Sequence, residues 1–354
     1  MALKRHSDQL LLRPSHVPPS RDDFEVIGAF NPGVAEFEGE VVLLVRVAER
    51  PKEQRPGYVP LPRWVPGDGL IIDWMSEDEV NQDDPRVVQV KKTGRMRLTY
   101  TSYLRLVRCG DGRAIREITD IQIKPETELE EFGIEDPRIT KIDDRYYITH
   151  VAVSRYGVST ALASTDDFKS FERLGVIFCP ENKDVVLFPE KIGNDYVALH
   201  RPVPGTPFNR PEMWTARSID LTDWGRHKWL HGGGSEWETG RVGAGAPPIR
   251  VDGGWLEIYH GNRRPNRPGA VGTYSAGAML LDAEDPSRIL RRTKEPILTP
   301  TTEFERIGFV HDVVFPTGIV ERENSYLIFL GAADTCCAVV ELDRQELLGS
   351  MQAV

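Results

Sequence analysis

The sequence contains no apolar run that approaches the roughly 18 residues needed to cross a membrane as a helix. Its N-terminus, MALKRHSDQLLLRPS, also lacks the continuous apolar core of a signal peptide. We therefore expect a cytoplasmic protein that makes no contact with a membrane.

Cysteine is scarce, and the spacing of Cys109, Cys179, Cys336 and Cys337 matches neither a zinc ribbon nor a secreted disulfide framework. The histidines show no close ligand spacing such as HExxH. No glycine loop of Walker or Rossmann type is present, which argues against a nucleotide cradle. We expect neither a metal nor another cofactor.

Positive charge is in the minority, because 44 Lys and Arg stand against 54 Asp and Glu, giving a formal net charge of −10. Such a surface disfavours general binding to nucleic acid or to an anionic membrane. Any anionic ligand would need a local basic pocket.

The chain does contain a repeat. Five times a short polar turn precedes a run of apolar and β-branched residues, which is typical of a β-hairpin. The runs end on polar residues: Arg46, His150, His200 with Arg201, His260 and Asp334. Hairpin units spaced roughly 50 to 70 residues apart, with one longer gap, predict an all-β, five-bladed propeller. If each run is the strand nearest the axis, the active site lies at one mouth of the central channel.

The repeats cover nearly all of the 354 residues, and no Ser/Gly-rich linker interrupts them. We expect an extended N-terminal arm over residues 1–20 and a single five-bladed catalytic domain over residues 21–354. The arm offers a surface for a homo-oligomer contact.

The sharpest local pattern is GIEDPR at Gly133. The pyrrolidine ring of Pro137 excludes the helical region for the preceding residue, so we expect the backbone of Asp136 to be extended and its carboxyl to be rigidly aimed. Glu135 would raise the pKa of this acid and Arg138 would lower it. The alternative is a turn aspartate that binds nearby backbone amides.

Basic residues at corresponding blade ends would converge on one small volume, although a single arginine on this surface could equally be solvated. Arg presents a planar fork and Lys a point charge, and both suit a phosphate anion. The basic candidates are Arg155, Arg173, Lys183, Arg201 and His260.

Other polar and aromatic groups could hold a sugar, although core packing is the alternative for each aromatic ring. The candidate sugar-binding residues are Asn31, Arg46, Glu135, Asp184, His200, Tyr259 and Asp334.

Together the segments GIEDPR, NKDVVLFPEK, ALHRP, GAGAPPI, LEIYHG and VVFPTG…GAADT resemble glycoside hydrolase family 130. The resemblance runs from about Asn31 to Asp334 and keeps the order of the motifs. It implies a five-bladed propeller and the inverting phosphorolysis of a terminal β-mannoside, β-1,2- or β-1,4-linked, to α-mannose 1-phosphate. Inorganic phosphate and a manno-oligosaccharide would be the substrates.

The resemblance also implies roles for particular residues. Asp136 matches the general acid, whose proton would reach the glycosidic oxygen through a sugar hydroxyl. Arg155 and Arg173 match the arginines that bind phosphate, with Lys183, Arg201 and His260 as further candidates.

Two other functions stay open. An inverting β-1,2-mannosidase would need a second carboxylate to activate water, and Glu212 or Glu238 could supply it. A propeller that binds sugar without catalysis is the other alternative.

Overall fold

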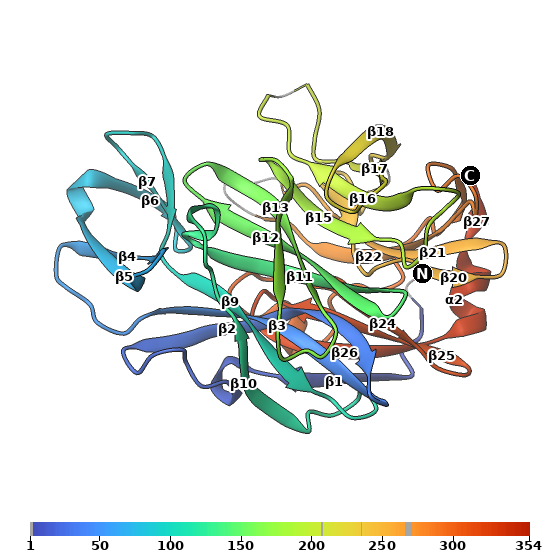
Figure 1. The fold of residues 1–354 in the computed structure, drawn as a ribbon, viewed down its shortest axis with the longest axis horizontal. Helices are drawn as coiled ribbons and strands as arrows, with labels where there is room; N and C mark the ends of the chain where they lie inside the picture. The colour runs from blue at the N-terminus through green and yellow to red at the C-terminus, as the bar shows by residue number, and fades with distance from the viewer. Residues whose placement is uncertain (1–2, 207, 235, 266–270) are drawn as a thin grey trace.

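The computed structural model describes residues 3–206, 208–234, 236–265 and 271–354. Strands make up 57% of the chain and helices 6%, which confirms the all-β prediction (Figure 1). Its α-helices are the short α1 (Glu303–Arg306) and α2 (Arg344–Ser350). Within the described ranges, no helix has the length and apolar character required to span a bilayer.

Five sheets contain four or more strands each, and hairpin connections dominate. In order along the chain the sheets consist of β2 (Phe24–Phe37), β3 (Glu40–Pro51), β9 (Thr101–Arg108) and β10 (Glu117–Ile123); β11 (Gly133–Ile142), β12 (Arg145–Ser154), β13 (Gly157–Thr165) and β14 (Glu172–Phe178); β15 (Asn182–Leu187), β16 (Tyr196–Pro202), β17 (Met213–Ser218) and β18 (Trp224–His231); β19 (Val242–Ala244), β20 (Ile249–Val251), β21 (Gly254–Asn262), β22 (Tyr274–Leu281), β23 (Ile289–Arg292) and β27 (Gln352–Ala353); and β24 (Val314–Glu321), β25 (Ser325–Ala332), β26 (Cys336–Asp343) and β1 (Ser7–Leu12).

The repeated apolar runs are strands β3, β12, β16, β21 and β25. Each is the second strand of its sheet when the strands are counted from β2, β11, β15, β19 or β24, respectively. In β3, alternate side chains enter two different cores: Val41, Leu43 and Val45 pack in one, and Val42 and Leu44 pack in the other. Both faces of the strand are therefore buried, because each sheet is covered by its neighbours.

The strands that meet across sheets are those that precede each turn. Strand β2 packs against β11 and β24, and β15 packs against β11 and β19. The sequence interpretation that placed the apolar run nearest the centre is therefore wrong by one strand. The strands before the turn carry the pocket residues Asn31, Asp136 and Asp184 among side chains that pack in the cores.

Three of these inner strands share a local distortion. The pairing register shifts between Phe30 and Gly33 in β2, between Glu135 and Arg138 in β11, and between Lys183 and Val186 in β15. Each bulge contains one residue with a left-handed backbone, which Asn and Asp tolerate better than other non-glycine residues. These residues are Asn31 (φ 47°), Asp136 (φ 48°) and Asp184 (φ 55°).

The expected N-terminal arm is partly a strand. Residues Ser7–Leu12 form β1, which pairs antiparallel with β26 and so completes the sheet built from the C-terminal part of the chain. This sheet thus combines a strand from the N-terminal part of the chain with three strands from its C-terminal part.

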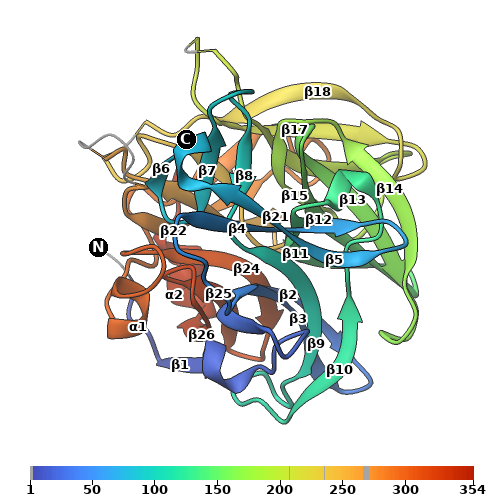
Figure 2. The same cartoon turned by 90° about the vertical axis from the view of Figure 1, so that its left-hand side faces the viewer.

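The long gap between the first two repeats forms a separate projection. Strands β4 (Tyr58–Val65) and β5 (Gly69–Ser76) pair with each other, and β6 (Val80–Asp84), β7 (Val87–Val90) and β8 (Met96–Leu98) form a three-stranded sheet. The projection has its own small core of Leu61, Val80 and Val88 and stands out to the left in Figure 1; Figure 2 faces it.

Candidate active site

A pocket of about 1380 Å³ lies where the inner strands meet, and residues from all five large sheets line it. Eight of the predicted site residues line this pocket: Asn31, Arg46, Glu135, Asp136, Lys183, Asp184, Arg201 and Asp334. Residues separated by up to 303 positions are thereby collected in one cavity.

Asp136 lies deep in the pocket, with 11% of its side chain exposed. Its Oδ1 accepts hydrogen bonds from Asn31 Nδ2 at 2.8 Å and Arg46 Nη1 at 2.9 Å. Burial would raise the pKa of this carboxyl, but the charges of Arg46, Arg138 and Lys183 outweigh burial and hold the pKa below its usual value. Asp136 is therefore an anion before substrate binds.

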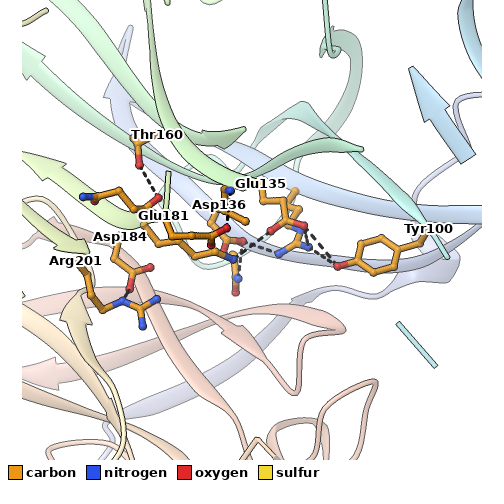
Figure 3. Close-up of polar contacts among 12 residues, drawn as sticks. Tyr100, Glu135, Asp136, Thr160, Glu181, Asp184 and Arg201 are labelled. Carbon is orange, nitrogen blue, oxygen red and sulfur yellow. Dashed lines mark hydrogen bonds and ion pairs between the residues drawn. The ribbon is translucent and has the colours of Figure 1, made fainter. Parts of the chain in front are cut away.

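Arg46 connects the two adjacent acids. Its Nη2 donates to Glu135 Oε1 at 2.6 Å while its Nη1 binds Asp136, and the guanidinium lies 4.7 Å from the centre of the Phe30 ring. Tyr100 closes this side, with its hydroxyl 3.2 Å from Arg46 Nη2 (Figure 3). Arg46 comes from β3, one strand away from the inner strand, and reaches the pocket because its neighbour Asn31 is bulged.

Asp184 forms a second ion pair, drawn on the opposite side of Asp136 in Figure 3. Its Oδ2 lies 2.6 Å from Arg201 Nε and 3.3 Å from His260 Nε2. Burial raises the pKa of Asp184, but Arg201 and His260 reverse the effect and lower it far below the ordinary value. Lys183 is more exposed, and its Nζ is 3.9 Å from Glu135 Oε2, so its ammonium can still bind an anion.

Asp334 sits on the turn after β25 with a left-handed backbone (φ 48°). Burial raises the pKa of Asp334 to about 6, and although Arg46 lowers it, the negative charge of Asp136 raises it further. The raised pKa places the titration of this carboxyl closer to neutral pH than that of an ordinary aspartate.

A stability measurement tests this assignment. A carboxyl whose folded pKa of about 6 exceeds its ordinary value of 3.8 stabilises the fold at low pH and loses that contribution as pH rises to 6. Asp334→Asn should remove this loss, so its unfolding free energy relative to wild type should rise by roughly 2–3 kcal/mol between pH 4 and pH 7. Urea denaturation at both pH values measures the change, and a constant difference would contradict the raised pKa.

Several predicted residues lie outside the pocket. Arg155 forms a bidentate pair with Glu131, and Arg173 binds Glu130 and the carbonyl of Lys124, so neither faces Asp136. The expectation that these two arginines join the basic cluster is corrected: local carboxylates on the segment before β11 hold both of them.

The predicted aromatic and imidazole groups are mostly buried behind the pocket. His260 is 1% exposed and contacts Asp184 from behind, while His200 bonds to Asn182 and His227. Tyr259 donates to Glu238 at 3.0 Å in a separate buried cluster. These three residues therefore support the walls instead of lining the pocket.

The two carboxylates considered for hydrolysis also lie outside. Glu212 accepts hydrogen bonds from Asn209 and Trp229, and the fully buried Glu238 binds Arg292 Nη1 at 2.8 Å. Neither lines the cavity that contains Asp136.

Sequence reasoning missed the lining residues that lie on connections between the repeats. Arg86 comes from the β6–β7 turn of the projection, and its guanidinium is held by Asp84. Tyr100, Arg210, Arg241 and Arg264 also lie on connections between strands, and Tyr274 lines the pocket from the first position of β22. The adjacent Arg263 and Arg264 after Asn262 were the sequence feature that could have indicated basic lining residues.

The arrangement combines several carboxylates, of which Asp136 is central, with cations and hydroxyl-binding groups, which is typical of a carbohydrate-processing pocket. A family model described as beta-1,4-mannooligosaccharide phosphorylase matches residues 104–353. The chain belongs to glycoside hydrolase family 130.

Two curated relatives are informative. The chain is 41% identical over 358 aligned residues to the beta-1,2-mannobiose phosphorylase of Listeria innocua, covering 99% of both chains. It is 37% identical to the 1,2-beta-oligomannan phosphorylase of Thermoanaerobacter, covering 70% of this chain and 81% of that one. The solved structure of the Listeria innocua enzyme with beta-1,2-mannobiose superimposes with a TM-score of 0.89 at 40% identity, covering 96% of each chain.

Proposed function

We propose that this enzyme cleaves a terminal β-mannoside, with β-1,2-mannobiose as the favoured substrate, by inverting phosphorolysis. The observation that carries the proposal is Asp136 at the centre of a pocket that also contains Lys183 and Arg201, while the neighbouring carboxylates Glu135 and Asp184 are held in ion pairs. The names of the similar phosphorylases favour the same reaction. We further propose that the five large sheets are blades of a propeller, with the pocket at one mouth of its channel.

The chemistry follows from the positions of the charges. Asn31, Arg46 and Asp334 bind the hydroxyls of the terminal mannosyl ring. The proton of Asp136 passes through a sugar hydroxyl to the glycosidic oxygen as the bond to the anomeric carbon breaks. A phosphate oxygen, held by Lys183 and Arg201, forms the new bond from the opposite face. The products are α-mannose 1-phosphate and the shortened acceptor.

The low pKa of Asp136 gives phosphate a second role. Phosphate bound beside Lys183 offsets one of the charges that lower the pKa of Asp136, and its own negative charge raises that pKa. Binding of the nucleophile thus helps the acid to acquire its proton.

Hydrolysis is less well supported, because an inverting hydrolase needs a carboxylate placed to activate water. Glu135 and Asp184 line the pocket but are held in ion pairs by Arg46 and Arg201. Glu181 accepts the backbone N–H of Val158 at 3.2 Å. A sugar-binding protein without catalysis is also less well supported, because sugar binding alone does not require an acid such as Asp136 beside a group of cations.

The test is phosphate dependence. Mannobioses of different linkage are incubated with and without inorganic phosphate, and the released sugar is identified. We expect α-mannose 1-phosphate from the β-1,2-linked substrate, and free mannose at a comparable rate without phosphate would establish a hydrolase instead.

Lys183→Gln should raise the KM for phosphate about 10- to 100-fold, since one charge-assisted contact is worth roughly 1.5–3 kcal/mol. Lys191→Gln is the matched control, because Lys191 lies on the surface over the Tyr196 ring and does not line the pocket. An unchanged KM for phosphate in Lys183→Gln would remove Lys183 from the phosphate site.

The cytoplasmic location, the homo-oligomer, the single catalytic domain and the absence of a cofactor stay predictions from the sequence. Among the described residues, no group of three or more His, Cys, Asp or Glu side chains is arranged to hold a metal ion.

A further inference from the structure

Three arginines gather at the mouth of the pocket, away from the two ion pairs that surround Asp136. Arg210 lies on the β16–β17 connection, Arg241 precedes β19, and Arg264 follows β21, and all three line the pocket. They come from two neighbouring sheets, so the cluster is built by the fold and is not a local run of charge.

Thr239 joins the three segments. Arg210 Nη1 donates to the Thr239 carbonyl at 2.6 Å, and the backbone N–H of Arg264 donates to Thr239 Oγ1 at 2.9 Å. Arg241 is tied to the same region, because its backbone N–H donates to Asn262 Oδ1 at 2.5 Å. The backbones of Arg241 and Arg264 and the side chain of Arg210 are therefore held in place before any ligand binds.

The protein neutralises the charge of this cluster only in part. The ion pair of Arg210 with Glu212 is long, at 3.7 Å, and no described carboxylate forms an ion pair with Arg241 or Arg264. The residues outside the described ranges include no Asp or Glu. By contrast, Arg46 and Arg201 deeper in the pocket are both paired at 2.9 Å or less.

The depth of the cluster separates it from the reacting phosphate. Phosphate must reach the anomeric carbon beside the buried Asp136, whereas Arg241 and Arg264 are exposed at the rim. The leaving sugar is the group that extends from the anomeric carbon towards the opening. The cavity, at about 1380 Å³, also exceeds the roughly 300–1,000 Å³ of most small-molecule sites, so a substituted leaving sugar fits.

We propose that Arg210, Arg241 and Arg264 form a second anion site that binds a phosphate monoester or carboxylate carried by the acceptor sugar. The proposal rests on the proposed phosphorylase function and extends its substrates to acidic mannosides. Guanidinium forks bind both kinds of oxyanion through paired hydrogen bonds, and a protein of net charge −10 would otherwise repel such acceptors.

The reverse reaction provides the test. With α-mannose 1-phosphate as donor, phosphate release is measured with mannose, mannose 6-phosphate and mannuronate as acceptors. We expect wild-type kcat/KM for at least one acidic acceptor to exceed that for mannose. The double variant Arg241→Gln/Arg264→Gln should lower this acidic-to-neutral ratio of kcat/KM at least tenfold. The acidic acceptor whose kcat/KM falls most identifies the preferred anion.

Arg263→Gln is the matched control, because Arg263 is the exposed neighbour of Arg264 but does not line the pocket. A wild-type preference for mannose over both acidic acceptors would overturn the proposal. A double variant with an unchanged ratio and a raised KM for phosphate would also overturn it, by assigning the arginines to the co-substrate.

Calorimetry keeps the two proposals separable. Titration of mannose 6-phosphate and mannuronate into wild type and the double variant needs no turnover. Loss of binding in the double variant would support the anion site even if wild type failed to phosphorolyse mannobiose, and equal binding by both proteins would reject it.

Discussion

Asp136→Asn is expected to lower kcat for the phosphorolysis of β-1,2-mannobiose about 10²- to 10⁴-fold, the usual loss when a positioned acid is removed. The amide has nearly the same shape but no acidic proton, so the leaving sugar would depart as an alkoxide. Asn also tolerates the left-handed backbone at this bulge, and its oxygen can still accept from Asn31. Steady-state kinetics and a melting curve together separate chemistry from folding.

Asp143→Asn is the matched control for this experiment. Asp143 lies on the turn between β11 and β12 with a similar left-handed backbone (φ 53°), but it is exposed and outside the pocket. Its kcat should match wild type. Near-normal kcat in Asp136→Asn would withdraw the acid assignment and leave the pocket without its central group.

Arg46→Gln is expected to destabilise the fold by about 3–5 kcal/mol, because it leaves the carboxylates of Glu135 and Asp136 buried without their shared cation. Arg46 is 6% exposed and binds both acids within 2.9 Å. The same change should raise the pKa of Asp136, since Arg46 is the largest charge that lowers it. The destabilisation should therefore be smaller at pH 5 than at pH 8, which urea denaturation at the two pH values measures.

Arg50→Gln serves as the comparison on the same strand. Arg50 pairs with Glu25 at 2.7 Å, but the side chains are 52% and 45% exposed, so the pair is screened by water. We expect a change below about 1 kcal/mol at either pH. If Arg46→Gln and Arg50→Gln lowered the free energy of unfolding equally, the acids beside Arg46 would have to be solvated and carry little buried charge.

The Asp136–Pro137 pair directs attention to the right carboxylate, but the backbone prediction there was wrong: an extended Asp136 was expected, and the structure gives it a left-handed conformation (φ 48°) within a bulge. Its role as the acid stays a prediction. The hairpin repeats indicate the five large sheets. The strand assignment failed because apolar density marks strands buried on both faces, as in β3, whereas the inner strands carry the bulged polar residues.

Tertiary partners explain the remaining errors. Arg155 and Arg173 are basic residues near the right strands, but Glu131 and Glu130 neutralise them. The periodicity of a sequence does not show which carboxylate will form an ion pair with a given arginine. Arg86 and Tyr100 could not be found from the repeats. Arg86 lies on the projection and Tyr100 on the segment that leads from the projection to β9, so neither belongs to a repeat.

The pairing of β1 with β26 has a consequence for how the protein is made. Ser7–Leu12 are synthesised long before their partner strand, which ends at Asp343, so strands β2 to β25 must all be made before this pairing can form. Until then the outer edge of β26 and the nascent N-terminal segment both have unpaired backbone groups, which invites association with other chains. Completion of this last sheet is therefore a late event in biogenesis, and a truncated transcript would yield a chain with an open edge.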